Sequence, residues 1–149
     1  MFITIIITTY NYEKYIKESV ESALNQDFPG EYEVIVIDDC STDGTLQILD
    51  SFNSLIRINN KENLGLEVSV NKAIRRASGK YIVRLDADDY FENNFLSEVY
   101  KHVESDSIFY YGNYTSISES GSHLSKVNLI KFNKEEVRCR GDFLATGTV

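Results

Sequence analysis

The run Phe2-Ile3-Thr4-Ile5-Ile6-Ile7-Thr8-Thr9-Tyr10-Asn11 begins with apolar and β-branched residues and ends in polar ones. A β-branched run without polar alternation is typical of a strand that is buried on both faces, as in a parallel sheet. Apolar residues with helical spacing follow between Tyr15 and Asn25. The start of the chain therefore predicts a strand inside an α/β sheet, followed by a helix.

The same strand-then-helix pattern is repeated along the chain. Further strands are expected at residues 32–37, 54–59, 81–85 and 108–111, and further helices at residues 68–77 and 93–104. Another helix is expected after Ser41 or Thr42, either of which could cap it, with Asp43 in its first turn. Strands that alternate with single helices imply a mostly parallel sheet covered on both faces. The predicted fold class is α/β, a Rossmann-like three-layer sandwich with a mostly parallel central sheet.

The composition excludes several classes of protein. The 149 residues are 42% hydrophobic and 26% charged, which is ordinary globular usage rather than that of a disordered or fibrous chain. The formal net charge of −8 disfavours sequence-blind binding to nucleic acid. No apolar run approaches the ~20 residues needed to cross a bilayer. Cys40 and Cys139 are too few for a disulfide framework, which favours reduced thiols in a cytoplasmic protein.

The segment Asp86-Ala87-Asp88 directly follows the apolar strand that starts at Tyr81. Residues i and i+2 of an extended segment point to the same side, so the carboxylates of Asp86 and Asp88 converge. Mg²⁺ or Mn²⁺ is commonly held by one or two carboxylates together with substrate phosphates, and would offset their repulsion. The alternative is that these aspartates cap the following turn, a role that suits Asp89 best. Arg84 is expected to pair with one of the carboxylates.

Two other polar segments follow predicted strands, and ligands of parallel sheets bind beyond the carboxyl ends of the strands. Neighbouring residues point in opposite directions, so we expect Asp39 to face the ligand and Asp38 to be bound into the loop or the next helix. The alternative is a charge that complements a helix dipole. Thr8 offers a hydroxyl and Tyr10 an aromatic face, although both could belong to an ordinary loop.

Taken together, these segments resemble the family 2 glycosyltransferases of the GT-A fold, from about Ile3 to about Val103. The matching segments are Ile5–Asn11, Ser22–Phe28, Glu33–Thr45, Asn63–Gly65, Ala77–Ile82 and Leu85–Asp89. The resemblance implies an inverting, metal-dependent transfer of a sugar to an acceptor hydroxyl in glycan or polysaccharide synthesis. The donor would be a nucleotide diphosphate sugar, most often a UDP-sugar, and the cofactor would be Mn²⁺ or Mg²⁺.

The resemblance also implies roles for single residues. Thr8, Tyr10 and Asp39 would line the nucleotide pocket, with Asp39 bonded to the base. Asp86 would contact the ribose or the metal, and Asp88 would be the direct metal ligand. The general base of the family lies well downstream of the Asp-x-Asp motif, so we expect it beyond Val149, and the chain alone could be inactive.

The expected organisation is a nucleotide-sugar-binding portion at residues 1–112 and the start of a truncated acceptor-side portion at residues 113–149. Residues 116–125 are serine-rich and predict an exposed loop or hairpin tip. The acceptor would be a saccharide or a lipid-linked molecule, and the protein would be cytoplasmic, with a peripheral position at the inner face of the membrane as a further expectation.

Two other functions are compatible with an acidic α/β domain. One is a module of the same fold that binds a nucleotide sugar without transferring it. The other is a phospho-acceptor signalling domain, which the order of the motifs disfavours. Such a domain needs an acidic pair after the first strand, whereas here the pair Asp38-Asp39 follows the second.

Overall fold

The computed structural model of the protein describes residues 3–101, 114–118 and 120–127. The chain divides into two units, residues 1–103 and 104–149, and each is described by itself. The first unit holds a four-stranded sheet and the second a two-stranded one. The predicted division between residues 112 and 113 remains a prediction.

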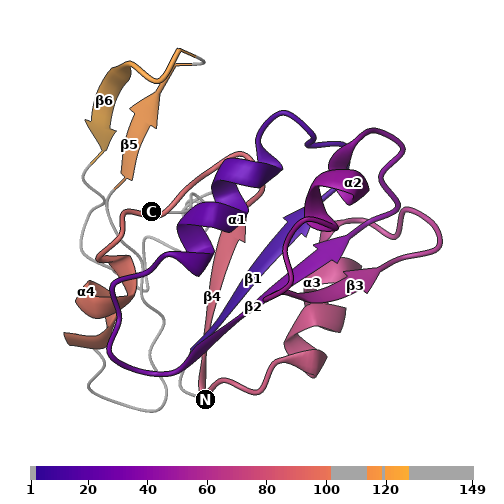
Figure 1. The fold of residues 1–149 in the computed structure, drawn as a ribbon, viewed down its shortest axis with the longest axis horizontal. Coiled ribbons are helices and arrows are strands. Elements are labelled where there is room, and N and C mark those ends of the chain that lie inside the picture. The colour runs from indigo at the N-terminus through magenta and orange to yellow at the C-terminus, as the bar shows by residue number, and fades with distance from the viewer. Residues whose placement is uncertain (1–2, 102–113, 119, 128–149) are drawn as a thin grey trace, which may run out of the picture. The chain divides into compact units, whose positions relative to one another are not determined.

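The first unit alternates strands with helices (Figure 1). The strands are β1 (Ile3–Thr9), β2 (Tyr32–Asp38), β3 (Ile56–Asn59) and β4 (Tyr81–Asp86), and the helices are α1 (Ile16–Leu24), α2 (Thr45–Leu49), α3 (Leu66–Arg76) and α4 (Phe95–Lys101). The strand order is β3-β2-β1-β4, and every pair in this sheet is parallel. The predicted α/β class with a parallel sheet is confirmed. The strand predicted at 108–111 and the end of the helix predicted to reach residue 104 lie outside the described residues.

Strand β1 lies inside the sheet and is buried on both faces. Ile3, Ile5 and Ile7 pack into the core under α1 and α2, whereas Ile6 packs into a second core on the α3 side of the sheet. All four side chains are fully buried. Helices flank the sheet on both sides (Figure 1). Because they cover both faces, β1 has no alternation of apolar and polar residues.

The register of the sheet brings the ends of its strands to one level. Thr8 is the partner of Ile37 on one side and of Asp86 on the other. Asp38 in turn lies opposite Asn59 of β3. We call the end of the sheet where the four strands finish the carboxyl edge. The loops that follow the strands therefore all start from this edge.

The opposite end of the sheet is held by a cluster around Glu33. A carboxylate oxygen of Glu33 accepts hydrogen bonds from Thr4 Oγ1 at 2.7 Å and from the Ser78 N–H at 2.7 Å. Thr4 Oγ1 also accepts a bond from the Gly79 N–H at 2.9 Å. Burial by itself would raise the pKa of Glu33, but the bonds from Ser78 and Thr4 outweigh it and hold the pKa below its ordinary value. This cluster fixes the connection from α3 into β4.

The second unit contains an antiparallel hairpin of β5 (Tyr114–Ile117) and β6 (His123–Val127). Gly121 in its turn has a φ of 78°, in the left-handed region that glycine tolerates. The exposed loop or hairpin tip predicted at residues 116–125 is part of this hairpin. Residues 116–117 and 123–125 belong to its strands rather than to its tip. None of the helices in the described part of the chain is long and apolar enough to cross a membrane.

Candidate functional site

The loops that follow β1 and β2 are joined through Asn11. Its Oδ1 accepts a hydrogen bond from the Thr42 N–H at 2.7 Å, and its own N–H donates to Ser41 Oγ at 2.9 Å. Asn11 has a φ of 60°, a left-handed conformation that asparagine tolerates better than most residues. The expectation that Ser41 or Thr42 caps α2 is wrong: α2 begins only at Thr45, and both residues bind the β1 loop instead.

A second set of contacts continues this join toward α2. The Asp43 carboxylate accepts hydrogen bonds from the Glu13 N–H at 3.1 Å and from the Thr45 N–H at 3.0 Å. The Glu13 carboxylate accepts one from the Gly44 N–H at 2.6 Å. The polar segment from residue 41 to 45 therefore links the loops at the carboxyl edge, although Thr42 is exposed.

Thr8 and Tyr10, both predicted to line a nucleotide pocket, lie at this edge. Thr8 is half-buried at the end of β1, beside Asp86 of β4. Tyr10 is 42% exposed, so an aromatic face remains accessible to a planar ligand.

Asp39 is buried, at 6% exposure, and its carboxylate is held by the chain itself. Oδ1 accepts hydrogen bonds from Asn60 Nδ2 at 2.7 Å, the Leu64 N–H at 3.0 Å and Ser69 Oγ at 3.0 Å, and Oδ2 accepts one from the Gly65 N–H at 2.8 Å. Burial would raise the pKa of Asp39, but these bonds outweigh it and lower the pKa. Asp39 thus fixes the 63–65 loop, a task that was not predicted from the sequence.

Asp38 points away from Asp39, as the alternation of the strand requires. Its Oδ2 accepts a hydrogen bond from the Ser41 N–H at 2.9 Å, so Asp38 is bound into the loop as expected. It is only 1% exposed, and its Oδ1 has no hydrogen-bond partner within the described part of the chain.

Asp86 and Asp88 have different surroundings. Two bonds from Arg84, at 2.5 and 2.8 Å, hold the Asp86 carboxylate, so the predicted pairing of Arg84 is confirmed. Asp88 is exposed, and within residues 3–101 no hydrogen bond or ion pair to its carboxylate is found. Burial raises the pKa of Asp86, and the neighbouring charges of Asp89 and Asp88 add to this, against the lowering effect of Arg84.

The negative charge of this segment reaches the loop after β1. The charge of Asp88 is the largest cause of the raised pKa of Tyr12, followed by burial of the phenol and the charge of Asp86. The acidic segment after β4 and the loop after β1 therefore share one electrostatic environment.

One face of α1 positions the segment that follows β4. Ser19 Oγ donates to the Asp86 carbonyl at 3.1 Å, and Ser22 Oγ accepts from the Phe91 N–H at 3.0 Å. Gln26 donates to the Glu92 carbonyl at 3.0 Å through Nε2. Ser19 and Ser22 lie three positions apart on one side of α1, and Gln26 follows two residues after the helix ends at Leu24. The sequence analysis missed this role, although polar residues at helical spacing in an otherwise apolar stripe could have indicated it.

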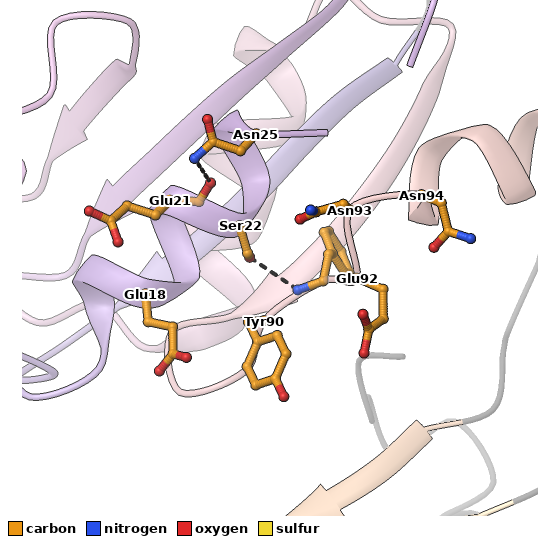
Figure 2. A pocket seen from close by; sticks show the side chains of 9 residues that line it. Glu18, Glu21, Ser22, Asn25, Tyr90, Glu92, Asn93 and Asn94 are labelled. Carbon is orange, nitrogen blue, oxygen red and sulfur yellow. Dashed lines mark hydrogen bonds between the residues drawn. The ribbon is translucent and has the colours of Figure 1, made fainter. Parts of the chain in front are cut away.

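A hollow of about 400 Å³ lies between α1 and residues 90–94 (Figure 2). Its lining is polar and acidic, with Glu18 and Glu21 on α1, Asn25 just after the helix, and Tyr90 and Glu92 opposite. None of the five predicted site residues lines it, so this hollow does not mark the predicted nucleotide site.

No group of three or more acidic, histidine or cysteine side chains within the described ranges is arranged to hold a metal ion alone. Asp86 and Asp88 carry carboxylate oxygens, which are ligands of the kind that Mg²⁺ and Mn²⁺ prefer.

A comparison with protein families decides the class of the protein. The model described as Glycosyl transferase family 2 matches residues 4–147. The chain belongs to glycosyl transferase family 2. This confirms the family resemblance inferred from the strand-end motifs.

Similar sequences and solved structures of family 2 glycosyltransferases agree. The putative teichuronic acid biosynthesis glycosyltransferase TuaG of Bacillus subtilis is 34% identical over 83% of this chain and 51% of its own length. The poly(ribitol-phosphate) β-N-acetylglucosaminyltransferase TarS of Staphylococcus aureus is 36% identical over 70% of this chain and 19% of its own. The chain thus spans about half of the first relative and less of the second.

Two similar structures were solved as complexes with nucleotide ligands. TarS 1–349, solved with UDP, has a TM-score of 0.64 and 39% identity over 68% of this chain and 31% of that one. The mannosyltransferase PcManGT of Pyrobaculum calidifontis, solved with GDP-Man and Mn²⁺, has a TM-score of 0.65 and 30% identity over 69% of this chain and 32% of that one. The GT-A fold predicted for this family 2 chain is confirmed.

Proposed function

We propose that the protein transfers a sugar from a UDP-sugar to an acceptor hydroxyl, with inversion at the anomeric carbon and with a divalent metal ion. The observation that carries the proposal is that, in a family 2 chain, the sheet register pairs Thr8 with Asp86 while a backbone bond joins Asp39 to Thr9 at the same edge. Support for a uridine nucleotide comes from TarS, which was solved with UDP and with UDP-GlcNAc. The names of TuaG and TarS favour a glycan or polyol-phosphate polymer as acceptor.

Asp88 and Asp86 are the residues proposed to hold the metal ion. Asp88 would be the direct ligand because it is exposed and accepts no bond within residues 3–101. Arg84 holds the Asp86 carboxylate in a fixed orientation, so Asp86 can contact the ribose or the ion without moving. A bound Mn²⁺ or Mg²⁺ supplies Lewis-acid stabilisation of the diphosphate leaving group.

The remaining residues of the edge would bind and orient the nucleoside. Tyr10 offers an exposed ring against which the base can stack, and Thr8 offers a hydroxyl beside Asp86. Asp39 stays ionised and can accept a hydrogen bond from a base N–H. Because Asp39, Asp86 and Asp88 are all committed to the donor in this proposal, we assign the general base to none of them.

The test measures two quantities: the binding of nucleotides and the release of UDP that accompanies sugar transfer. Calorimetry with UDP is expected to show binding that strengthens when Mn²⁺ or Mg²⁺ is added. A coupled assay, carried out with a protein that also includes the general base, is expected to detect UDP release from UDP-sugars in the presence of polymer acceptors. Absence of binding to every nucleoside diphosphate, with or without metal, would overturn the proposal. Binding of UDP without release from any UDP-sugar would instead support a non-catalytic binding module.

A further inference from the structure

The acceptor positions of the Asp39 carboxylate are almost fully used by the chain. An ionised carboxylate has about four acceptor positions, two on each oxygen. Oδ1 already accepts three hydrogen bonds, whereas Oδ2 accepts only the bond from the Gly65 N–H at 2.8 Å. The one remaining acceptor position therefore lies on Oδ2, and the orientation of the carboxylate decides where it points.

That orientation depends on Asn60, a buried residue just beyond β3 with 8% exposure. Asn60 Nδ2 donates to Asp39 Oδ1 at 2.7 Å and to Ser69 Oγ at 2.8 Å, and Oδ1 of Asn60 accepts from Lys72 Nζ at 2.7 Å. A lysine can only donate and an ionised carboxylate can only accept, so these two partners fix which way the Asn60 amide faces. Lys72 thereby acts on Asp39 through Asn60 without touching it.

Ser69 and Lys72 both come from α3 and lie three positions apart, hence on one helix face. Ser69 is 1% exposed, and its hydroxyl donates to Asp39 Oδ1 at 3.0 Å. Lys72 is half-buried, and its ammonium group is bound to Asn60. The α3 face therefore carries a polar network that ends at the carboxyl edge.

The backbone fixes the same residues at their ends. The Asp39 N–H donates to the Thr9 carbonyl at 2.8 Å, and the Asn60 N–H donates to the Asp38 carbonyl at 2.8 Å. These bonds continue the sheet ladder beyond the strands. The side chains of Asp39 and Asn60 thus start from a rigid edge, and their hydrogen bonds are preorganised before any ligand arrives.

We propose that Lys72, Asn60 and Ser69 form a positioning network that aims Asp39 Oδ2 at an N–H of the nucleotide base and so makes the site selective for uracil over cytosine. The inference rests on the proposed function, since it assumes that Asp39 contacts the base. Uracil presents an imide N–H on its pairing edge, where cytosine presents an acceptor nitrogen. An acceptor held in place therefore favours the first base and repels the second.

The experiment compares UDP with CDP by calorimetry on the folded protein and its variants. The wild-type protein is expected to bind UDP more tightly than CDP. Lys72→Met keeps the aliphatic stem but removes the charge and the donor, and is expected to weaken UDP binding about tenfold while CDP affinity stays within about twofold. Lys72→Arg retains a donor and is expected to restore most of the selectivity. Ser69→Ala, which removes one bond to Asp39, is expected to act in the same direction.

The control is Arg75→Met, which removes one positive charge from an exposed position of the same helix. It is expected to leave both affinities unchanged. Equal losses for UDP and CDP in Lys72→Met and Ser69→Ala would overturn the inference, because a purely structural role affects both nucleotides alike. A wild-type protein that binds UDP and CDP equally would overturn it too, while leaving the proposed function standing. Only a wild-type protein that binds no nucleoside diphosphate would overturn both.

Discussion

Adjacent carboxylates of this protein have different surroundings and hence different tasks. Asp38 is 1% exposed and bound to the Ser41 N–H, whereas Asp39 accepts four bonds, three from the loop between β3 and α3 and one from α3. Asp86 is held by Arg84, and Asp88 is exposed. Residue type alone therefore does not determine the role of a carboxylate at the carboxyl edge.

Asp88→Asn is expected to abolish the effect of Mn²⁺ on UDP affinity, because an amide is a much poorer ligand for a hard cation than a carboxylate. Calorimetry with and without Mn²⁺ measures this difference. The matched control is Asp89→Asn, which removes the same charge from the next residue. If the two variants lose the metal effect equally, the local negative charge rather than ligation by Asp88 is responsible.

The connecting loops are stabilised by elements far away in the chain. The β1 loop bonds to the 41–45 segment, α1 bonds to the last residue of β4, and Glu33 of β2 bonds to Ser78 before β4. Each contact joins residues that are about 30 to 70 positions apart in the chain. The loops of the site are thus held in place by hydrogen bonds to other elements of the fold rather than by contacts within each loop.

Asn11→Ala is expected to destabilise the protein more than Asn11→Gly. Both variants lose the acceptor for the Thr42 N–H, which costs about 1 kcal/mol. The alanine must also adopt the φ of 60°, and this left-handed conformation adds about 1 kcal/mol for a residue with a Cβ. Urea unfolding of the two variants measures the difference. Equal free energies of unfolding would show that the backbone relaxes at this position.

Gly79→Ala is expected to lower the free energy of unfolding by about 1–3 kcal/mol, the usual range for overpacking. A Cβ at this position would lie 2.5 Å from the Thr4 backbone nitrogen and 2.6 Å from Thr4 Oγ1, so the amino end of β1 or β4 would have to move. Urea unfolding measures the change, with Lys80→Ala at the exposed neighbouring position as control. A variant as stable as the wild-type protein would contradict the close approach.

The whole molecule is expected to lose stability in acid. The pKa values of Glu33 and Asp39 are held below their ordinary values of 4.5 and 3.8, so the unfolded chain takes up protons on these groups before the folded one does. Their contribution is complete above the ordinary pKa values and is lost as the pH falls through the lowered ones. The pKa of Asp86 is raised, so protonation of Asp86 in acid favours the folded state and partly offsets this loss of stability. Urea midpoints are expected to be constant near neutral pH and to fall below about pH 4.5.

Glu33→Gln provides the matched test of this acid sensitivity. The variant removes one of the carboxyl groups whose protonation in acid destabilises the fold. Its urea midpoint is therefore expected to vary less with pH below 4.5 than that of the wild-type protein. Glu62→Gln, which alters an exposed carboxyl, is the control. An unchanged slope in Glu33→Gln would show that other carboxyl groups dominate.

Several features of the fold and the site were predictable because they depend on neighbours in the chain. The run of apolar and β-branched residues in β1 predicted its burial. The i and i+2 argument for Asp86 and Asp88 assumed an extended segment, whereas β4 ends at Asp86 and Asp88 lies in a turn, so the convergence of the two carboxylates stays a prediction. Arg84, two residues before Asp86, was correctly expected to pair with a carboxylate. These inferences need only the periodicity of a strand.

Other features were missed because their partners are distant in the chain. Asn60 and Ser69 meet Asp39 only after β2, β3 and α3 have packed together. The bond from Lys72 to Asn60 could not be derived from the pattern of α3 alone, because Asn60 lies outside that helix. Ser41 and Thr42 looked like helix caps, since capping residues and loop-bridging residues have the same hydroxyl chemistry.

By itself the sequence determined the α/β class, the order of strands and helices, the position of the acidic segments at strand ends and the resemblance to the family. The tertiary structure alone decided which acceptor atoms are already occupied, which side chains hold others in place, and that the hollow beside α1 lies away from the predicted residues. The physical reason is the range of the interactions. Periodicity and strand polarity act between neighbours, whereas hydrogen bonding of a buried carboxylate depends on donors that only folding brings within 3 Å.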